Sequence, residues 1–223
     1  MNLKLFAEAL TKFFIGVILV GILIFWSAGS LSFWPGWLLM GLLFLPMFVA
    51  GLVMMAKNPG LLRERLDAKE KEKEQKSVVG LSGLLFIASF VLAGINWRYQ
   101  WMLLPDWAIY TAAVVFVICY LLYAEVLREN TYLSRTIKVQ ENQKVIDTGL
   151  YGIVRHPMYF ATTILFLAMP LVLGSPISFL IMLLYLPLIA KRIKNEETVL
   201  ENGLEGYKEY KQRVKYRMIP FIW

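Results

Sequence analysis

Histidine and cysteine are almost absent from this 223-residue chain, which contains one of each. The single cysteine, Cys119, excludes an intramolecular disulfide, and its place inside an apolar run indicates a small packed residue. The single histidine, His156, cannot form a zinc site, and no cluster of cysteine and aspartate at ligand spacing accompanies it. We therefore predict no metal site. No serine lies in a nucleophile-elbow motif, which makes a Ser-His-Asp hydrolase a weak interpretation.

Charge is also scarce and unevenly placed. Charged residues make up 17% of the chain and hydrophobic residues 58%, which is too apolar for an ordinary soluble surface. Aspartate, glutamate, lysine and arginine are missing from 13–56, 77–97, 107–124 and 157–190. A helix needs about 20 apolar residues to cross the hydrocarbon of a membrane. Such long runs without alternation exclude a β-barrel and predict an all-α polytopic membrane protein.

The first 127 residues (1–127) are expected to form an N-terminal transmembrane frame. The first apolar run is too long for one helix, and SAGSLSFWPGW interrupts it with small residues and a proline. Asn58-Pro59-Gly60 should stop the second helix, and the charged linker 57–76 should be a solvated helix or loop at the lipid headgroups, with gating of lipid access as the alternative. The four spans are placed near Phe13–Trp26, Trp34–Ala56, Ser77–Trp97 and Trp107–Leu127.

The remaining residues, 128–223, contain one more apolar run between two polar patches. This run, Phe160–Ala190, is interrupted by Gly174-Ser175-Pro176. The two arms are short for full crossings and are expected to form a tight hairpin that polar turns lengthen at the cytoplasmic end. The chain should therefore have five to six transmembrane helices, of which the last two are a short hairpin.

The positions of lysine and arginine predict the orientation. If both termini are cytoplasmic, 22 of the 23 lysines and arginines lie on the cytoplasmic side and only Arg98 lies outside. This bias is typical of multi-pass membrane proteins. The net charge of +7 is therefore explained by membrane topology, and no basic motif interleaved with aromatics indicates a nucleic-acid partner. Both polar patches are expected on the cytoplasmic side.

The first polar patch is Gln140–Tyr159, and it contains the only histidine. Pro157 disfavours helical geometry at the residue before it, so the chain should bend at His156. Asp147-Thr148-Gly149 is typical of a turn or a helix cap. Taken alone, a single histidine at a membrane boundary is more often a residue of the interface than part of a site.

The second patch follows the last apolar run. Arg192 and Glu196 are four residues apart, which places them on one helical face. A surface ion pair of little energetic value would be the ordinary interpretation, but these residues leave the bilayer on the same side as His156. Tyr207 and Tyr210 are expected to pack the tail against the membrane surface or the core.

Both patches carry motifs of a known family. The pattern G-L-Y-x-x-V-R-H-P-x-Y, then R-x-x-x-E-E-x-x-L and then G-Y-x-x-Y, resembles the isoprenylcysteine carboxyl methyltransferase family. These integral membrane enzymes use S-adenosylmethionine and are similar to the phospholipid N-methyltransferases. The resemblance covers about residues 130–223, and it makes 128–223 the C-terminal methyltransferase catalytic region.

The resemblance implies a cytoplasmic cofactor pocket built from this C-terminal half. Arg192 matches the arginine that faces the substrate and is the expected catalytic residue. Glu196 matches the cofactor-binding glutamate, where a carboxylate suits the ammonium of the methionine moiety. The cofactor-binding residues implied by the match are Gln140, Gln143, Lys144, Val145, Ile146, Tyr151, His156, Pro157, Met158, Tyr159 and Glu196.

The chemistry of the acceptor stays open at this point. Methyl transfer needs alignment and exclusion of water, and a carboxylate acceptor needs no base but needs its charge accommodated, which the planar fork of Arg192 can do. A lipophilic carboxylate that enters from the bilayer is therefore favoured. A phospholipid amine or a small thiol would need Glu197 or His156 as a base. Two further interpretations stay open, a sterol-reductase-like NADPH enzyme, although no glycine-rich fingerprint is present, and a non-enzymatic scaffold or transporter.

Overall fold

The computed structural model describes residues 3–67 and 73–223, and within them the only regular secondary structure is helical. This confirms the prediction of an all-α protein. The helices in chain order are α1 (Leu3–Ala28), α2 (Trp34–Lys57), α3 (Pro59–Leu66), α4 (Lys73–Tyr99), α5 (Asp106–Glu129), the 3-10 turn η1 (Gly149–Gly152), α6 (Pro157–Val172), α7 (Pro176–Met182), α8 (Tyr185–Gly203) and α9 (Tyr207–Arg213).

Five helical stretches are long and apolar enough to cross a membrane, namely α1, α2, α4, α5 and the α7–α8 stretch Pro176–Gly203. The shorter α6 is also apolar, so the prediction of five to six spans is confirmed. α6 and α7 meet at the expected break, where Gly174 has a φ of +70°. The second arm is lengthened by polar turns, as expected, because α8 continues to Gly203 and carries the second polar patch on the same helix.

A short interruption separates α7 from α8. Pro187 has no N–H to donate to the carbonyl of Leu183, which in a continuous helix would be its partner. The Leu183 carbonyl accepts a hydrogen bond from the Leu186 N–H at 3.0 Å instead. The chain therefore turns once and then continues as α8, with Pro187 in the first turn of that helix.

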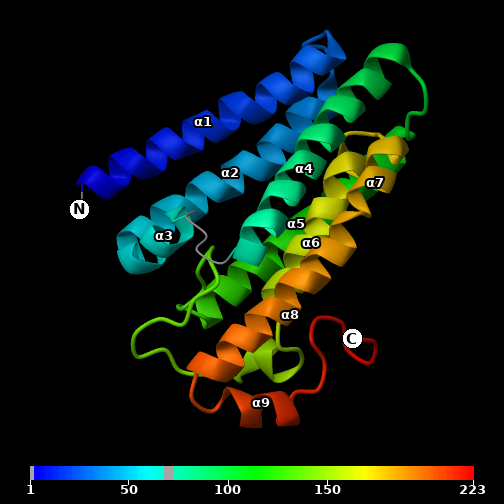
Figure 1. The fold of residues 1–223 in the computed structure, drawn as a ribbon. Coiled ribbons are helices and arrows are strands. Elements are labelled where there is room, and N and C mark those ends of the chain that lie inside the picture. The colour runs from blue at the N-terminus through cyan, green and yellow to red at the C-terminus, as the bar shows by residue number, and fades with distance from the viewer. Residues whose placement is uncertain (1–2, 68–72) are drawn as a thin grey trace.

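The helices form one bundle with a shared apolar core. α4 packs against α1 on one side and against α7 and α8 on the other, while α5 packs along α6 (Figure 1). The fully buried side chains of this core include Ile24, Phe33, Leu39, Phe116 and Val172, and Cys119 is packed among them as predicted. The outward faces keep large apolar side chains exposed, as expected for helices in contact with lipid.

The contact between α1 and α4 depends on Gly94. A Cβ at Gly94 would lie 1.9 Å from Ser27 Oγ and 2.7 Å from the backbone nitrogen of Ala28. Gly83, on the same helix, has no neighbour within 4 Å of such a Cβ. We predict that Gly94→Ala destabilises the bundle by about 1–3 kcal/mol through overpacking, whereas Gly83→Ala changes its stability by at most about 1 kcal/mol. Thermal unfolding in detergent measures the stability of both variants, and equal unfolding temperatures would contradict the close α1–α4 contact.

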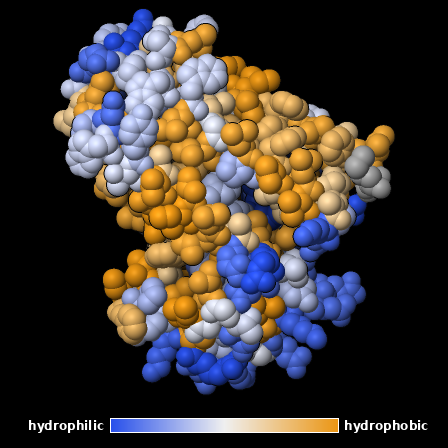
Figure 2. Space-filling view, turned by 180° about the vertical axis from the view of Figure 1, so that it is seen from behind, coloured by the Kyte–Doolittle hydropathy of each residue, from blue (hydrophilic) through white to orange (hydrophobic). Residues whose placement is uncertain are grey.

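The polar segments gather at one end of the bundle. The N-terminus, α3, the segment 130–156 and α9 lie there, and the connections α1–α2, α4–α5 and α6–α7 lie at the opposite end (Figure 1). Figure 2 shows hydrophilic side chains concentrated at the first end below a broad apolar band. Both polar patches therefore lie at the same end, while the assignment of that end to the cytoplasm stays a prediction.

The charged linker does more than separate two spans. Asn58 ends α2 and caps α3, where its side-chain oxygen accepts from the Leu61 N–H at 3.1 Å. Glu64 on α3 pairs with Lys138 at 2.5 Å, and Arg65 donates to the Ser134 carbonyl at 3.3 Å. α3 thus fixes the segment that follows α5. Residues 68–72 of the linker lie outside the described residues. The predicted boundary at residue 127 falls near the end of α5 and stays a prediction.

Candidate functional site

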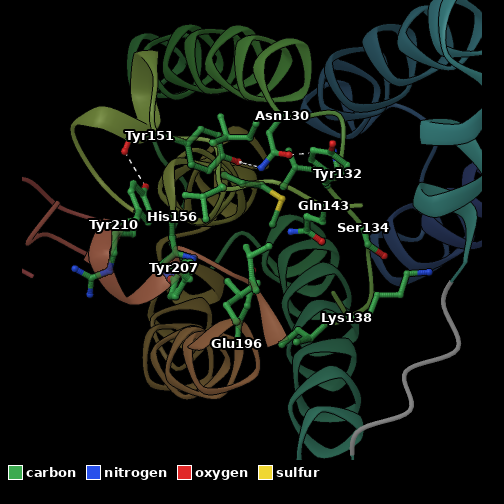
Figure 3. A pocket seen from close by; sticks show the side chains of 18 of the residues that line it. Asn130, Tyr132, Ser134, Lys138, Gln143, Tyr151, His156, Glu196, Tyr207 and Tyr210 are labelled. Carbon is green, nitrogen blue, oxygen red and sulfur yellow. Dashed lines mark hydrogen bonds between the residues drawn. The ribbon is translucent and has the colours of Figure 1, made fainter. Parts of the chain in front are cut away.

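A pocket opens at the polar end of the bundle, between the segment that follows α5, the turn before α6, and helices α8 and α9 (Figure 3). Its wall is mixed, with aromatic and aliphatic side chains beside many polar and charged ones. The residues that line it are Asn130, Tyr132, Leu133, Ser134, Thr136, Ile137, Lys138, Gln143, Lys144, Val145, Ile146, Tyr151, Arg155, His156, Met158, Tyr159, Arg192, Glu196, Leu200, Leu204, Tyr207 and Tyr210.

The predicted bend at His156 is present. His156 is the residue before α6 and has φ −128° and ψ 61°, outside the helical region, and Pro157 is the first helical residue. The bend turns the chain from η1 into α6, and both Arg155 and His156 are buried there. The buried bend therefore forms part of the pocket wall.

Glu197, on α8, holds this wall in place. Its side chain is buried, and Oε1 accepts from Arg155 Nε at 2.7 Å and lies 3.3 Å from His156 Nε2. Its other oxygen accepts from Arg217 Nε at 2.9 Å. Both oxygens are thus committed to neighbouring cationic or ring nitrogens. This argues for a structural role of Glu197 and against its use as a general base.

Arg155 extends the same network to the C-terminal tail. Its NH1 group donates to the carbonyls of Val214 and Lys215 at 2.7 and 2.8 Å. The Arg155 and His156 N–H groups donate to the carbonyls of Tyr216 and Arg217 at 2.9 and 2.7 Å. A buried guanidinium needs several acceptors, and the tail provides them. Arg155 and His156 therefore connect the turn before α6 to both α8 and the C-terminal tail.

Arg192 and Glu196 are joined through a tyrosine. The Tyr159 hydroxyl donates to Glu196 Oε2 and accepts from Arg192 Nε at 3.0 Å. Arg192 also donates to the side-chain oxygen of Gln75 at 3.2 Å and to the Arg135 carbonyl at 2.9 Å. The guanidinium is thus positioned by α4, α6 and the segment after α5, and Tyr159 connects it to the carboxylate one helical turn away.

The structure brings ten of the twelve predicted site residues together in this pocket. The segment after α5 contributes Gln143, Lys144, Val145 and Ile146, and η1 contributes Tyr151. The bend contributes His156, Met158 and Tyr159, and α8 contributes Arg192 and Glu196. Which of these side chains bind a ligand stays a prediction.

Gln140 and Pro157 do not line the pocket. The Gln140 side chain donates to the Tyr132 carbonyl, and its backbone N–H donates to the Gln143 side-chain oxygen at 2.9 Å. Both hydrogen bonds lie within the segment that follows α5 and stabilise its conformation. Pro157 is buried at the first position of α6, where its ring fixes the bend. Both residues therefore shape the pocket from outside.

Sequence reasoning missed several of the lining residues. Asn130 donates to the Tyr151 hydroxyl at 3.0 Å, and the Tyr210 hydroxyl donates to the Tyr151 carbonyl at 2.7 Å (Figure 3). Tyr207 and Tyr210 pack with Leu204 and Val214, as expected, but they also face the pocket. Tyr207 differs from its neighbours because its buried hydroxyl has no hydrogen-bond partner among the described residues.

The hydroxyls of Tyr151, Tyr207 and Tyr210 remain protonated. Burial raises the pKa of Tyr207, and the nearby carboxylates of Glu197 and Glu196 raise it further. Burial likewise raises the pKa of Tyr151 and of Tyr210. Near neutral pH these groups are therefore neutral hydrogen-bond donors.

Comparison with known proteins supports the resemblance. The isoprenylcysteine carboxyl methyltransferase (ICMT) family model matches residues 108–202, which run from α5 to the end of α8. The Delta(14)-sterol reductase TM7SF2 of Mus musculus is 30% identical over 91 residues, and the Delta(14)-sterol reductase of Methylotuvimicrobium alcaliphilum is 27% identical over 93 residues. Each alignment covers 40% of this chain and 22% of the relative.

These matches concern a region and not a whole protein. The chain aligns with about a fifth of the length of either reductase. The family match includes the bend at His156, Arg192 and Glu196. The sequence and the helices together support a multi-pass membrane protein with a methyltransferase-like function.

Proposed function

We propose that this protein is an S-adenosylmethionine-dependent membrane methyltransferase that acts on a lipophilic carboxylate. The observation that carries the proposal is the Arg192–Tyr159–Glu196 chain in a pocket at the polar end of a membrane bundle. It places a guanidinium and a carboxylate one helical turn apart, so one site offers a group for an acidic acceptor and a group for a cationic donor.

The residues present fit the cofactor. The amino-acid end of S-adenosylmethionine carries an ammonium, for which the Glu196 carboxylate is a suitable partner. The segment Gln143–Ile146 would line the adenosine side, with Tyr151 packed nearby. The buried Tyr207 hydroxyl lacks a partner in the part of the chain that the structure describes, as expected of a group that a ligand completes. When bound, the cofactor supplies an electrophilic methyl group.

Catalysis by this chain would depend on positioning. Arg192 would hold the acceptor carboxylate by a bidentate contact, which fixes the direction of its lone pairs. Tyr159 holds the guanidinium in register with Glu196, so that the two ends of the site keep a fixed separation. The wall around the buried Arg155 and His156 would help to exclude water from the bound ligands. No proton has to be removed from a carboxylate acceptor, so the site needs no general base.

The membrane setting suits a lipophilic acceptor. Arg192 lies within the α7–α8 stretch Pro176–Gly203, which is long and apolar enough to cross a membrane, so an amphiphile could place its head at the guanidinium and its tail among apolar side chains. A cytoplasmic location of the pocket follows from the distribution of lysine and arginine. Phospholipid amines and small thiols are the alternative acceptors on the same scaffold.

A second candidate function is a reductase that uses NADPH. The observation in its favour is that two of the relatives are Delta(14)-sterol reductases. The pocket also contains Lys138 and Lys144, which could pair with phosphate groups. Against this candidate, Lys138 is already paired with Glu64 at 2.5 Å.

Titration of the purified protein in detergent separates the two candidates. Isothermal calorimetry with S-adenosylhomocysteine and, separately, with NADPH is expected to show saturable binding of the former only. Binding of NADPH without binding of S-adenosylhomocysteine would contradict the proposal and favour the reductase.

The acceptor class is identified by the stability of the product. Radiolabelled methyl transfer into a membrane lipid extract should give a product that releases volatile methanol under base, as methyl esters do. N-methyl and S-methyl products keep the label under base. A base-stable product would agree with methyltransferase activity but would contradict a carboxylate as the acceptor.

A further inference from the structure

Tyr207 lies in the pocket wall and has a buried hydroxyl that none of the described residues bonds. The residue is 4% exposed, and its hydroxyl has no hydrogen-bond partner among residues 3–67 and 73–223. Figure 3 shows Tyr207 beside His156 in the wall of the pocket. Buried hydroxyls are nearly always bonded, so an orphan of this kind in a pocket wall indicates a partner that a ligand brings.

The neighbouring tyrosine shows that the orphan is not a general feature of this region. Tyr210 lies three residues on in α9, is equally buried, and donates its hydroxyl proton to the Tyr151 carbonyl at 2.7 Å. The two rings pack against each other with centroids 5.7 Å apart. Among the described residues, one of these two tyrosine hydroxyls therefore has a hydrogen-bond partner and the other has none.

The chemistry around Tyr207 indicates what the partner is. Burial and the nearby carboxylates of Glu197 and Glu196 raise the pKa of its hydroxyl, which therefore keeps its proton. That proton has no acceptor among the described residues, so a ligand group that accepts it would complete the hydroxyl. In the proposed function Glu196 binds an ammonium that belongs to an amino acid. The carboxylate of an amino acid is attached to the same carbon as its ammonium, so it must lie close to Glu196 as well.

We propose that the Tyr207 hydroxyl donates a hydrogen bond to the carboxylate of the methionine moiety of the bound cofactor, an inference that rests on the proposed function. Glu196 and Tyr207 then recognise the two charged groups of the amino-acid end together. The ligand carboxylate would be repelled by the nearby Glu196 carboxylate unless the ammonium of the same amino acid is bound there too. The site is therefore selective for a ligand that carries both groups.

Tyr207→Phe tests the assignment with two probes. The probes are S-adenosylhomocysteine and its decarboxylated analogue, which keeps the amine and lacks the carboxylate. We expect the variant to bind S-adenosylhomocysteine about 10- to 100-fold more weakly than the unaltered protein does and to bind the analogue equally well. Unchanged affinity for S-adenosylhomocysteine, or an equal loss for both probes, would overturn the proposal.

Thermal unfolding of the ligand-free protein gives the second readout. Tyr207→Phe removes a buried hydroxyl that has no partner in the described part of the chain, so the variant is expected to unfold at the same temperature as the unaltered protein or higher. Tyr210→Phe, the matched control, breaks a buried bond and should unfold at a lower temperature. A lower unfolding temperature for Tyr207→Phe would mean that the hydroxyl has a structural partner, which contradicts the inference. Failure of the unaltered protein to bind S-adenosylhomocysteine would instead reject the proposed function itself.

Discussion

Arg192→Ala is expected to lower the rate of methyl transfer about 100- to 1000-fold while the affinity for S-adenosylhomocysteine changes little, because the guanidinium acts on the acceptor. Glu196→Gln is expected to lower the affinity for S-adenosylhomocysteine about 10- to 100-fold, because it removes the charge that pairs with the ammonium. Glutamine keeps a side-chain oxygen for the Tyr159 hydroxyl, so the change is confined to charge. Calorimetry and single-turnover methyl transfer measure the two quantities separately.

The contrast between the two variants is the informative part. Lys194→Ala, an exposed change on the same helix, is the control and should leave both quantities unaltered. Because Tyr159 connects Arg192 to Glu196, we expect Arg192→Ala to lower the affinity for S-adenosylhomocysteine only slightly. An equal loss of affinity in Arg192→Ala and Glu196→Gln would mean that both side chains bind the cofactor and that the acceptor has another partner.

The fold was largely predictable because a bilayer restricts the options. Long runs without charge leave the backbone no partner except itself, so the helices α1, α2, α4 and α5 follow from the positions of charged residues. The break at Gly174 was readable as well. The interruption between α7 and α8 was not, since the turn at Leu183–Leu184 arises from the missing N–H of Pro187, after which the helix resumes across the polar patch.

The site was predictable where local chemistry determines it. The bend at His156 follows from the proline after it, and the common face of Arg192 and Glu196 follows from helical spacing. Hydrogen bonds and ion pairs between residues far apart in the chain could not be predicted from the sequence. Nothing in the order of residues shows that Glu197 bonds Arg155 and Arg217, or that the Tyr207 hydroxyl finds no partner among the described residues. Such facts depend on which side chains the tail and α8 bring together.

The role of Glu197 leads to the largest expected effect on stability. Its side chain is 3% exposed and pairs with that of Arg155, which is 4% exposed. Glu197→Gln would leave the guanidiniums of Arg155 and Arg217, the first of them buried, without their shared counter-charge. Breaking a buried pair from one side costs about 3–5 kcal/mol, because the remaining charge stays buried. We therefore expect Glu197→Gln to lower the thermal unfolding temperature in detergent markedly.

Glu201→Gln is the matched control for this loss, since Glu201 lies one turn further along α8 and also pairs with a cation. That pair, with Lys211, is partly exposed on both sides, with 31% for Glu201 and 35% for Lys211, so its loss should cost at most about 1 kcal/mol. Glu197 also positions the pocket wall through His156. Glu197→Gln should therefore weaken S-adenosylhomocysteine binding even at temperatures where the protein is folded, whereas Glu201→Gln should not. Equal effects of the two substitutions would show that the wall is held by packing alone.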